Sequence, residues 1–410
     1  MPCLPHGLGR NLRFFATEDV TPGTPVAAST ADAVKVLTSD FDWQQERVTR
    51  DDSRQTRSIL ERITRRKTVS WSAEGYLIPS GTNDTPPDAR MLIAAAMGGK
   101  TALGGGNADA SVVETINGGT SVVYSLVANQ VLQTLSLYRE VNAIQMEMLK
   151  GAWVEGMTIS APGGDEPKIS FEGGAFDAVG TGNALLATTL AGGESAFDVD
   201  EADGDAFEVG SVVTVGSSGP HIVTGITPAT PKYAIAIGDT ITGAQTAGTA
   251  EVLPYIPTET TLGNPIAGIA GVATFTPTSE LGNALAAVDL SAPLTSFELS
   301  LVNNIKPLDD EAFQDAVGCL IPMFRMVTGT IGLRGRKDLV IQLARRKQFQ
   351  LHNLVVDIGS GTGTRFRVTL PTIELDSSKL EIPQSDEATF SLPFTALGAS
   401  GEDEFTLTQL

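Results

Sequence analysis

In the stretch TVSWSAEGYLI, residues 68–78, small polar residues alternate with apolar ones, and this pattern is the clearest indication of the fold. Val69, Trp71 and Ala73 would face one side and the residues between them the other, which is the two-residue period of a half-buried strand. Gly75 interrupts the alternation, and a glycine at such a place favours a β-bulge. The stretch therefore predicts a bulged strand with one face on a core.

A second strand of this kind, MVTGTIGLRG, lies at residues 326–335. Each of the two is preceded by another alternating strand and a polar arm. In the first case the strand spans 34–43 and the arm 44–67; in the second they span 295–302 and 303–322. The order and spacing of these segments agree over both halves of the chain, which indicates a tandem duplication.

A short helix is expected after each of the two strands. The first, DARMLIAAAMGG, follows a Pro-Pro pair and ends at Gly98 and Gly99, which are typical start and stop signals. The second, RKDLVIQLARRKQ, spans 336–348. Further strands follow each helix, among them two separate strands at 143–149 and 154–161.

The segment between the two units differs in composition. Residues 178–262 are rich in Gly, Ala, Thr and Asp, and they contain ten acidic residues against Lys232 as the only base. Short alternating stretches with glycine turns favour a small acidic β domain over a flexible linker, which is the alternative. We therefore predict a mainly β protein: two tandem β-sandwich domains at 1–177 and 263–410, each flanked by a short helix, and an inserted β domain at 178–262.

Composition limits the functional classes. The chain has 410 residues and a formal net charge of −20, a sign that repels nucleic acid rather than holding its phosphates. Its two cysteines, Cys3 and Cys319, show no disulfide or metal pattern. The sequence lacks a signal-peptide-like apolar core and a membrane-spanning apolar run. We expect a protein made in a host cytoplasm.

Motifs for catalysis or cofactors are weak. GGKT at 98–101 lacks the first glycine of a phosphate-binding loop, and GSGTG at 359–363 lies between two predicted strands, as a hairpin turn would. DVDEADGDAFE at 198–208 satisfies no register of a calcium loop. The histidines have no ligands at metal spacing, and no G-x-S-x-G elbow is present. We expect no catalytic residues, cofactor or metal.

The two arms carry opposite charge. The first has the bases Arg47, Arg50, Arg54, Arg57, Arg62, Arg65, Arg66 and Lys67, and the second has the acids Asp309, Asp310, Glu311 and Asp315. Complementary charge sets orientation and register between partners, so these residues are candidate contacts between copies of the chain. The alternatives are two solvated loops, or DNA binding by the basic arm.

Three parts of the sequence form a recognisable pattern: the start RFFATEDVTPGTP, the strand–arm–strand–helix unit through SWSAEGYLIPSGTNDTPPDARMLIAAAMGG, and the closing strands GAWVEGMTISAPGGDEPKISFEG. In this pattern the chain resembles the tail tube proteins of tailed bacteriophages. The resemblance covers both units but not the insert. It implies β-sandwiches, each with a helix and a long loop contacting neighbouring subunits, in stacked rings around a channel for DNA.

Most members of that family carry one unit and form rings of six, whereas this chain has two. The resemblance therefore implies a ring of three chains with pseudo-sixfold symmetry, in preference to six. Its partners would be copies of itself and other tail proteins, its location the virion tail, and DNA would pass without specific binding. The main alternative is a β-rich carbohydrate-binding or adhesin-like module; an enzyme is a third.

Overall fold

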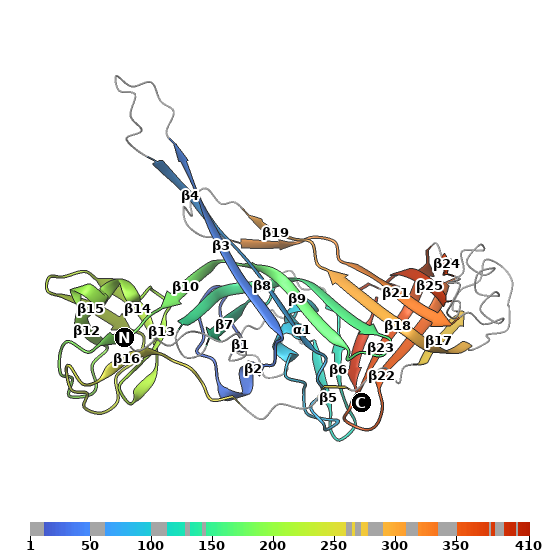
Figure 1. Cartoon of the computed structure of the whole chain (residues 1–410), viewed down its shortest axis with the longest axis horizontal. Helices are drawn as coiled ribbons and strands as arrows, with labels where there is room; N and C mark the ends of the chain where they lie inside the picture. Colours follow the sequence, from blue (N-terminus) through green and yellow to red (C-terminus); the bar gives the residue numbers. More distant parts are fainter. Residues whose placement is uncertain are drawn as a thin grey trace, which may run out of the picture.

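The computed structural model describes residues 12–49, 62–99, 113–127, 132–141, 145–259, 265–266, 272–277, 290–308, 319–334, 351–376, 379–381, 389–398 and 401–410. Within them the protein is mainly β, as predicted. Its strands form a large 18-stranded sheet, a 6-stranded sheet and a 2-stranded sheet. The large sheet bends over a core that both halves of the chain share, and the 6-stranded sheet lies at one end of the molecule (Figure 1).

The first part of the large sheet contains β1 (Leu12–Glu18), β2 (Ala33–Val34), β3 (Thr38–Thr49), β4 (Arg62–Tyr76), β7 (Leu135–Val141), β8 (Gln145–Pro162), β9 (Lys168–Ala175) and β10 (Asp177–Thr181). β3 pairs with β4, β4 with β9 and β9 with β8, all antiparallel. The first half of β8 pairs with β7 and β10. Strand β5 (Glu114–Asn117) pairs with β6 (Ser121–Ser125).

The later part contains β17 (Val272–Pro277), β18 (Leu290–Val302), β21 (Met326–Arg334), β22 (Leu351–Gly359), β23 (Arg365–Leu375), β24 (Lys379–Glu381), β25 (Thr389–Ala396) and β26 (Thr406–Gln409). β18 pairs with β21, and β21 with β25. β24 and the end of β23 both pair with β25. β26 pairs with β23 and with β6, which ties the end of the chain to its first part.

The pairing of β8 with β18 joins the two parts into one sheet. Residues Gly156–Pro162 of β8 lie antiparallel to Ser296–Val302 of β18 over seven partnered residues. The strands therefore run β3–β4–β9–β8–β18–β21–β25–β24 across one continuous curved layer. Among the described residues, β3 pairs only with β4 and β24 only with β25, so these two strands form its outer edges.

The bulge expected at Gly75 is absent from the pairing of β4 with β9, in which Gly75 faces Ile169 without a shift of register. Just before β3, the nitrogen of Leu37 donates to the Glu74 carbonyl at 2.7 Å, and Thr38 of β3 pairs with Glu74. A Cβ at Gly75 would lie 2.5 Å from the Lys35 carbonyl oxygen, so only glycine allows this approach. In the later part of the sheet, the pairing of β18 with β21 has a register shift between Leu294 and Ser296.

The first predicted helix is confirmed as α1 (Arg90–Ala96), whose Leu92–Met97 segment is buried. Gly98 follows with a φ of +91°, a conformation that ends helices. Arg90 and Glu114 form a buried ion pair at 3.0 Å, and the Tyr124 hydroxyl donates to the same carboxylate at 2.8 Å. The second predicted helix, 336–348, lies outside the described residues.

The prediction of separate strands at 143–149 and 154–161 is wrong. The structure has one strand, β8, through the whole stretch. Gly151 lies inside it at φ +65°, and a Cβ there would be 2.4 Å from the Phe176 ring. This glycine bends the strand without ending it, and register shifts on both sides let the two halves pair with different neighbours.

The acidic segment folds as strands. β11 (Ala184–Leu185), β12 (Ala196–Asp200), β13 (Val212–Val215), β14 (Ser218–Thr227), β15 (Lys232–Ile237) and β16 (Glu251–Pro254) form the 6-stranded sheet around their own apolar cluster. Val212 packs with Phe15 and Tyr138 of the large sheet's side. Residues 201–206, within the loop compared with calcium sites, form a 3-10 helix. The domain boundaries at 177 and 262 stay predictions.

Candidate functional site: a hydroxyl-lined sheet face and two hairpin arms

One face of the continuous layer is lined by small hydroxyl side chains and carboxylates. Pairing registers place them in rows across the strands, and all are exposed or half-buried. We call this surface the hydroxyl face: Thr38, Asp40, Asp42, Thr68, Ser70, Ser72, Glu74, Thr158, Ser160, Ser170, Glu172, Ser296, Glu298, Ser300, Thr328, Thr330, Ser391 and Thr395. The residues between them, such as Trp71, Ile159 and Leu299, are buried in the core.

The hydroxyl face is hollowed where β3, β4, β8 and β9 meet. One hollow is lined by Asp40, Asp42, Ser70, Ser72 and Glu172 among others, and the next by Thr38, Glu74, Thr158 and Ser170 among others. No deep apolar pocket opens here among the described residues; both hollows are shallow and polar. Such a surface offers no shaped site for a small ligand.

The electrostatics of the hydroxyl face are acidic. Two bases meet its carboxylates: Lys168 Nζ lies 2.7 Å from Glu74 Oε1, and Arg139 Nη1 lies 3.8 Å from Asp40 Oδ1. Burial and the neighbouring Glu172 carboxylate both raise the pKa of Glu155, beside the first hollow. The charge density is high enough that one carboxylate disfavours the ionisation of another.

Glycines allow β4, β8 and β9 to pack closely behind the face. A Cβ at Gly173 would lie 1.9 Å from the Trp153 carbonyl oxygen, and one at Gly174 would overlap the Trp153 ring. The Trp71 indole donates to the carbonyls of Trp153 and Gly174 at 3.2 and 3.1 Å. The two tryptophans thus hold the layer rigidly from its core side.

The basic arm begins as a long β-hairpin that projects away from the rest of the molecule (Figure 1). Arg62, Arg65 and Arg66 lie in β4, and Arg47 lies exposed in β3. Arg50, Arg54 and Arg57 lie outside the described residues. The structure therefore brings the described bases of this arm together on a two-stranded stalk rather than on a loop.

Lys67 has an intramolecular partner at the base of this arm. Its Nζ lies 2.8 Å from Asp177 Oδ1, and Lys150 Nζ lies 3.0 Å from Asp177 Oδ2. Although burial acts in the opposite direction, these two ammonium groups lower the pKa of Asp177. Lys67 also lies 5.4 Å from the ring centre of Trp43, which is 55% exposed. It anchors the base of the arm.

The second arm is also a hairpin at its base. β19 (Ile305–Leu308) pairs with β20 (Cys319–Pro322) as a separate two-stranded sheet. Ile305 is buried with Trp153 of β8, and Leu320 packs against them. Leu320 of this arm thus contacts the first part of the large sheet. The acids Asp309, Asp310, Glu311 and Asp315 lie outside the described residues.

The two hairpins share one register. Thr38 pairs with Glu74 as Ser296 pairs with Gly332, and Arg47 pairs with Thr64 as Ile305 pairs with Pro322. Equivalent residues differ by a constant 258 (296 minus 38, and 322 minus 64). The stretch from Arg47 to Thr64 therefore has the same length as the stretch from Ile305 to Pro322, and each follows a pair of strands in the large sheet.

A Ser–His–Asp chain lies in the 6-stranded sheet. His221 Nε2 is 2.8 Å from Ser218 Oγ, and His221 Nδ1 is 2.8 Å from Asp239 Oδ1. The order of atoms matches that of a nucleophilic triad. Yet Ser218 is only 1% exposed, and its oxygen also accepts the Thr242 amide proton at 2.8 Å and contacts the Thr242 hydroxyl at 3.0 Å. A buried and fully bonded oxygen is placed to hold two turns together.

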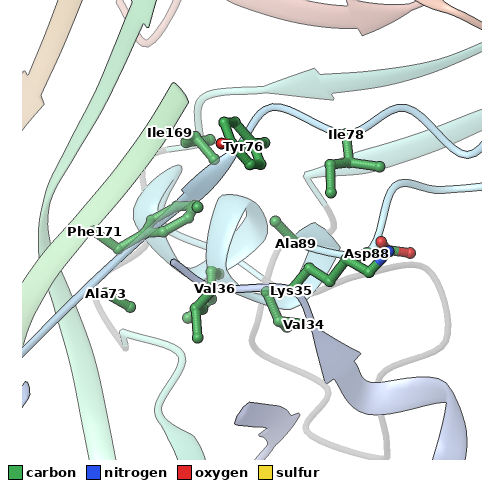
Figure 2. Close-up of a pocket in the computed structure, with 12 residues that line it drawn as sticks. Val34, Lys35, Val36, Ala73, Tyr76, Ile78, Asp88, Ala89, Ile169 and Phe171 are labelled. Carbon is green, nitrogen blue, oxygen red and sulfur yellow. The ribbon is translucent and has the colours of Figure 1, made fainter. Parts of the chain in front are cut away.

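A small cavity lies between β2, β4 and α1 (Figure 2). Its volume of about 20 Å³ suits one water molecule. Its walls are mostly apolar, with Val34, Ala73 and Phe171 among them, and Asp88 and Lys35 at one side. Burial raises the pKa of Asp88 to about 6, and the Lys35 charge only partly opposes this. The cavity is too small for a cofactor.

Two other features bear on possible sites. Among the described residues, no cluster of histidine, cysteine and carboxylate side chains could hold a metal ion. In the same part of the chain, no helix is long and apolar enough to cross a bilayer. Comparison with known proteins finds no matching family and no similar curated protein.

Proposed function

We propose that this chain is a structural subunit of a phage-type tail tube, which assembles into stacked rings around a channel for DNA. The observation that carries the proposal is the pairing of β8 with β18, through which two similar sets of strands form one curved layer. A layer built by joining such sets at their edges, with β3 and β24 left open, is suited to further joining by the same kind of contact.

We infer that the two sets of strands are tandem copies of one β-sandwich unit, with the segment at 178–262 inserted between them. The constant offset between the hairpins supports this, as does their equivalent position in the layer. Three chains would then supply six units to a ring. The insert would project from the ring, because its acids are exposed or half-buried.

The hydroxyl face would line the channel. Its carboxylates repel the phosphates of DNA, and its short hydroxyl side chains offer no basic group to hold them. The polymer would therefore slide past without binding. The opposite, core-packed face could not serve this role, since its side chains are buried.

Negative-stain electron microscopy of the concentrated protein tests this proposal. Rings or tubes with a central channel are the expected result. A compact monomer under every condition of concentration, salt and crowding would contradict the proposal. A variant with Glu172 and Glu298 changed to lysine should still assemble, because neither residue lies in an edge strand, and its tubes should retain DNA in a filter-binding assay, whereas the parent tubes should not.

A further inference from the structure

The open edge of β3 has a counterpart inside the same molecule. Thr38–Gln44 of β3 corresponds to Ser296–Val302 of β18 at the constant offset between the two hairpins. β18, however, has a second neighbour, because β8 pairs with its other side. The joint between β8 and β18 thus shows what a complete edge of this kind looks like.

The backbone of β3 is oriented for such a partner. On the side away from β4, the Ser39 carbonyl accepts a hydrogen bond from Arg139 Nη1 at 3.1 Å. Because backbone groups alternate along a strand, Phe41 and Trp43 direct their N–H and C=O groups to that same side. In β18 the equivalent residues, Leu299 and Leu301, face Ile159 and Met157 of β8.

The exposed fractions of equivalent side chains differ between the edge of β18, which β8 covers, and the edge of β3, as expected if β3 lacks its partner. Leu301 is 0% exposed at the completed edge, whereas Trp43, at the equivalent position of β3, is 55% exposed. Leu299 is 1% exposed and Phe41 is 9% exposed. A large exposed aromatic residue beside an unpaired strand edge is typical of a surface that another chain covers.

The complementary edge is β24. Lys379 of β24 pairs with Ser391 of β25, and Thr158 of β8 pairs with Ser170 of β9 in the same way. The residue numbers of both equivalent partners differ by 221 (379 minus 158, and 391 minus 170). β24 therefore occupies in the later part of the sheet the place that the second half of β8 occupies in the first. Its outer side is unpaired among the described residues.

We propose that β3 of one chain pairs antiparallel with β24 of a second copy, in the register of the internal β8–β18 joint. Since Ser300 faces Thr158 in that joint, Asp42 of one copy would face Lys379 of the next, and Phe41 would face Leu380. The first pair joins opposite charges, and the second joins apolar residues. Trp43 would be covered as Leu301 is. This inference rests on the proposed function and names its chain-to-chain contact.

Disulfide trapping tests this register. Cys3 and Cys319 are first changed to serine, and Asp42→Cys and Lys379→Cys are then combined in one chain. Residues that face each other without exchanging hydrogen bonds lie about 4.5 Å apart between Cα atoms, which suits a disulfide. The matched control combines Asp42→Cys with Glu381→Cys, two residues out of register. Each single-cysteine chain serves as a further control.

The expected result is an interchain disulfide in the assembled 42/379 protein, with a ladder on a non-reducing gel that ends at three chains. The 42/381 control should give at least tenfold less product. Rings or tubes that form under reducing conditions but give no 42/379 product on oxidation would overturn the proposed register while leaving the proposed function intact. A cysteine-free parent that never assembles would overturn both.

Fluorescence of the parent protein gives a second readout. Trp71 and Trp153 are 3% and 6% exposed, so acrylamide reaches mainly Trp43 in the free chain. Assembly should reduce the quenching constant several-fold, and Trp43→Phe should remove this change. A quenching constant that is the same before and after assembly would also overturn the proposed contact.

Discussion

Serine and threonine side chains define the hydroxyl face one residue at a time. They occupy every second position of the strands that form it, with large apolar residues between them. A strand exposed to solvent on an ordinary protein usually alternates with lysine or glutamate as well. Short hydroxyl side chains and a few carboxylates give the face low relief, a hydrated surface and an acidic character.

Asp88 gives a test of electrostatics at this scale. Its pKa in the folded protein is about 6, above the value near 4 of an unfolded chain. The folded state thus holds the proton more tightly, and this residue's contribution to stability falls as pH rises from about 4 to about 6. Asp88→Asn should be stabilised relative to the parent by roughly 1–3 kcal/mol more at pH 7 than at pH 4.

Urea unfolding of both proteins at the two pH values measures this difference. Asp84→Asn, at an exposed neighbouring position, is the matched control. An equal effect of Asp88→Asn at pH 4 and pH 7 would show that burial does not raise this pKa.

The sequence identified much of the residue pattern. The alternation in residues 68–78 correctly predicted the strand, whereas the bulge expected at Gly75 is absent from the pairing of β4 with β9. It did not identify the hydroxyl face, although serine and threonine recur at every second position in several predicted strands. The reason is that a face exists only when strands are placed side by side, and β8 and β18 are more than a hundred residues apart in the chain.

Among the strands, β8 depends on one glycine. Gly151 adopts a positive φ and its Cα hydrogen faces the Phe176 ring. Gly151→Ala should lower the free energy of unfolding by about 2–4 kcal/mol, through backbone strain and steric overlap together. Gly164→Ala isolates the first effect, because Gly164 also has a positive φ but open space around it; it should cost about 1 kcal/mol. Equal losses in thermal or urea unfolding would contradict the steric explanation.

The basic hairpin should contribute to assembly through its charge. Changing Arg62, Arg65 and Arg66 to glutamate should block ring formation and leave the circular dichroism and unfolding midpoint of the free chain unchanged, because complementary charges set the register between partners. Sedimentation velocity measures the assembly. Changing Asp200, Glu201 and Asp205, which are exposed on the insert, to lysine is the control with three reversed charges. Unchanged assembly of the arginine variant would count against docking of the arm.

Sequence patterns were least informative about where individual strands begin and end. Two strands were expected where β8 is one, because the break in alternation around Gly151 has the same appearance as a turn. The arms were expected as polar segments, yet each begins as two paired strands. A hairpin rich in charged residues has the same composition as a polar loop. Only the pairing of its two strands in the structure distinguishes the hairpin from the loop.

At the scale of the whole molecule, the described strands of the curved layer form one completed joint and leave two open edges. The joint between β8 and β18 lies inside the chain, where connection through the insert makes it intramolecular. The open edges, β3 and β24, would meet only between chains. A duplicated subunit of this kind would close a ring with half as many chain-to-chain contacts as single units need, and it allows the two kinds of joint to differ in sequence.

Three chains in each ring, with the hydroxyl face lining the channel, are the central claim. A three-dimensional electron-microscopy reconstruction of the assembled protein tests it most directly. We expect rings of three chains and a continuous wall of strands in which β3 lies beside β24 of the neighbouring chain. The hydroxyl face, from Asp40 in β3 to Ser391 in β25, should line the channel. Six chains in a ring, or a channel lined by any other surface of the chain, would contradict it.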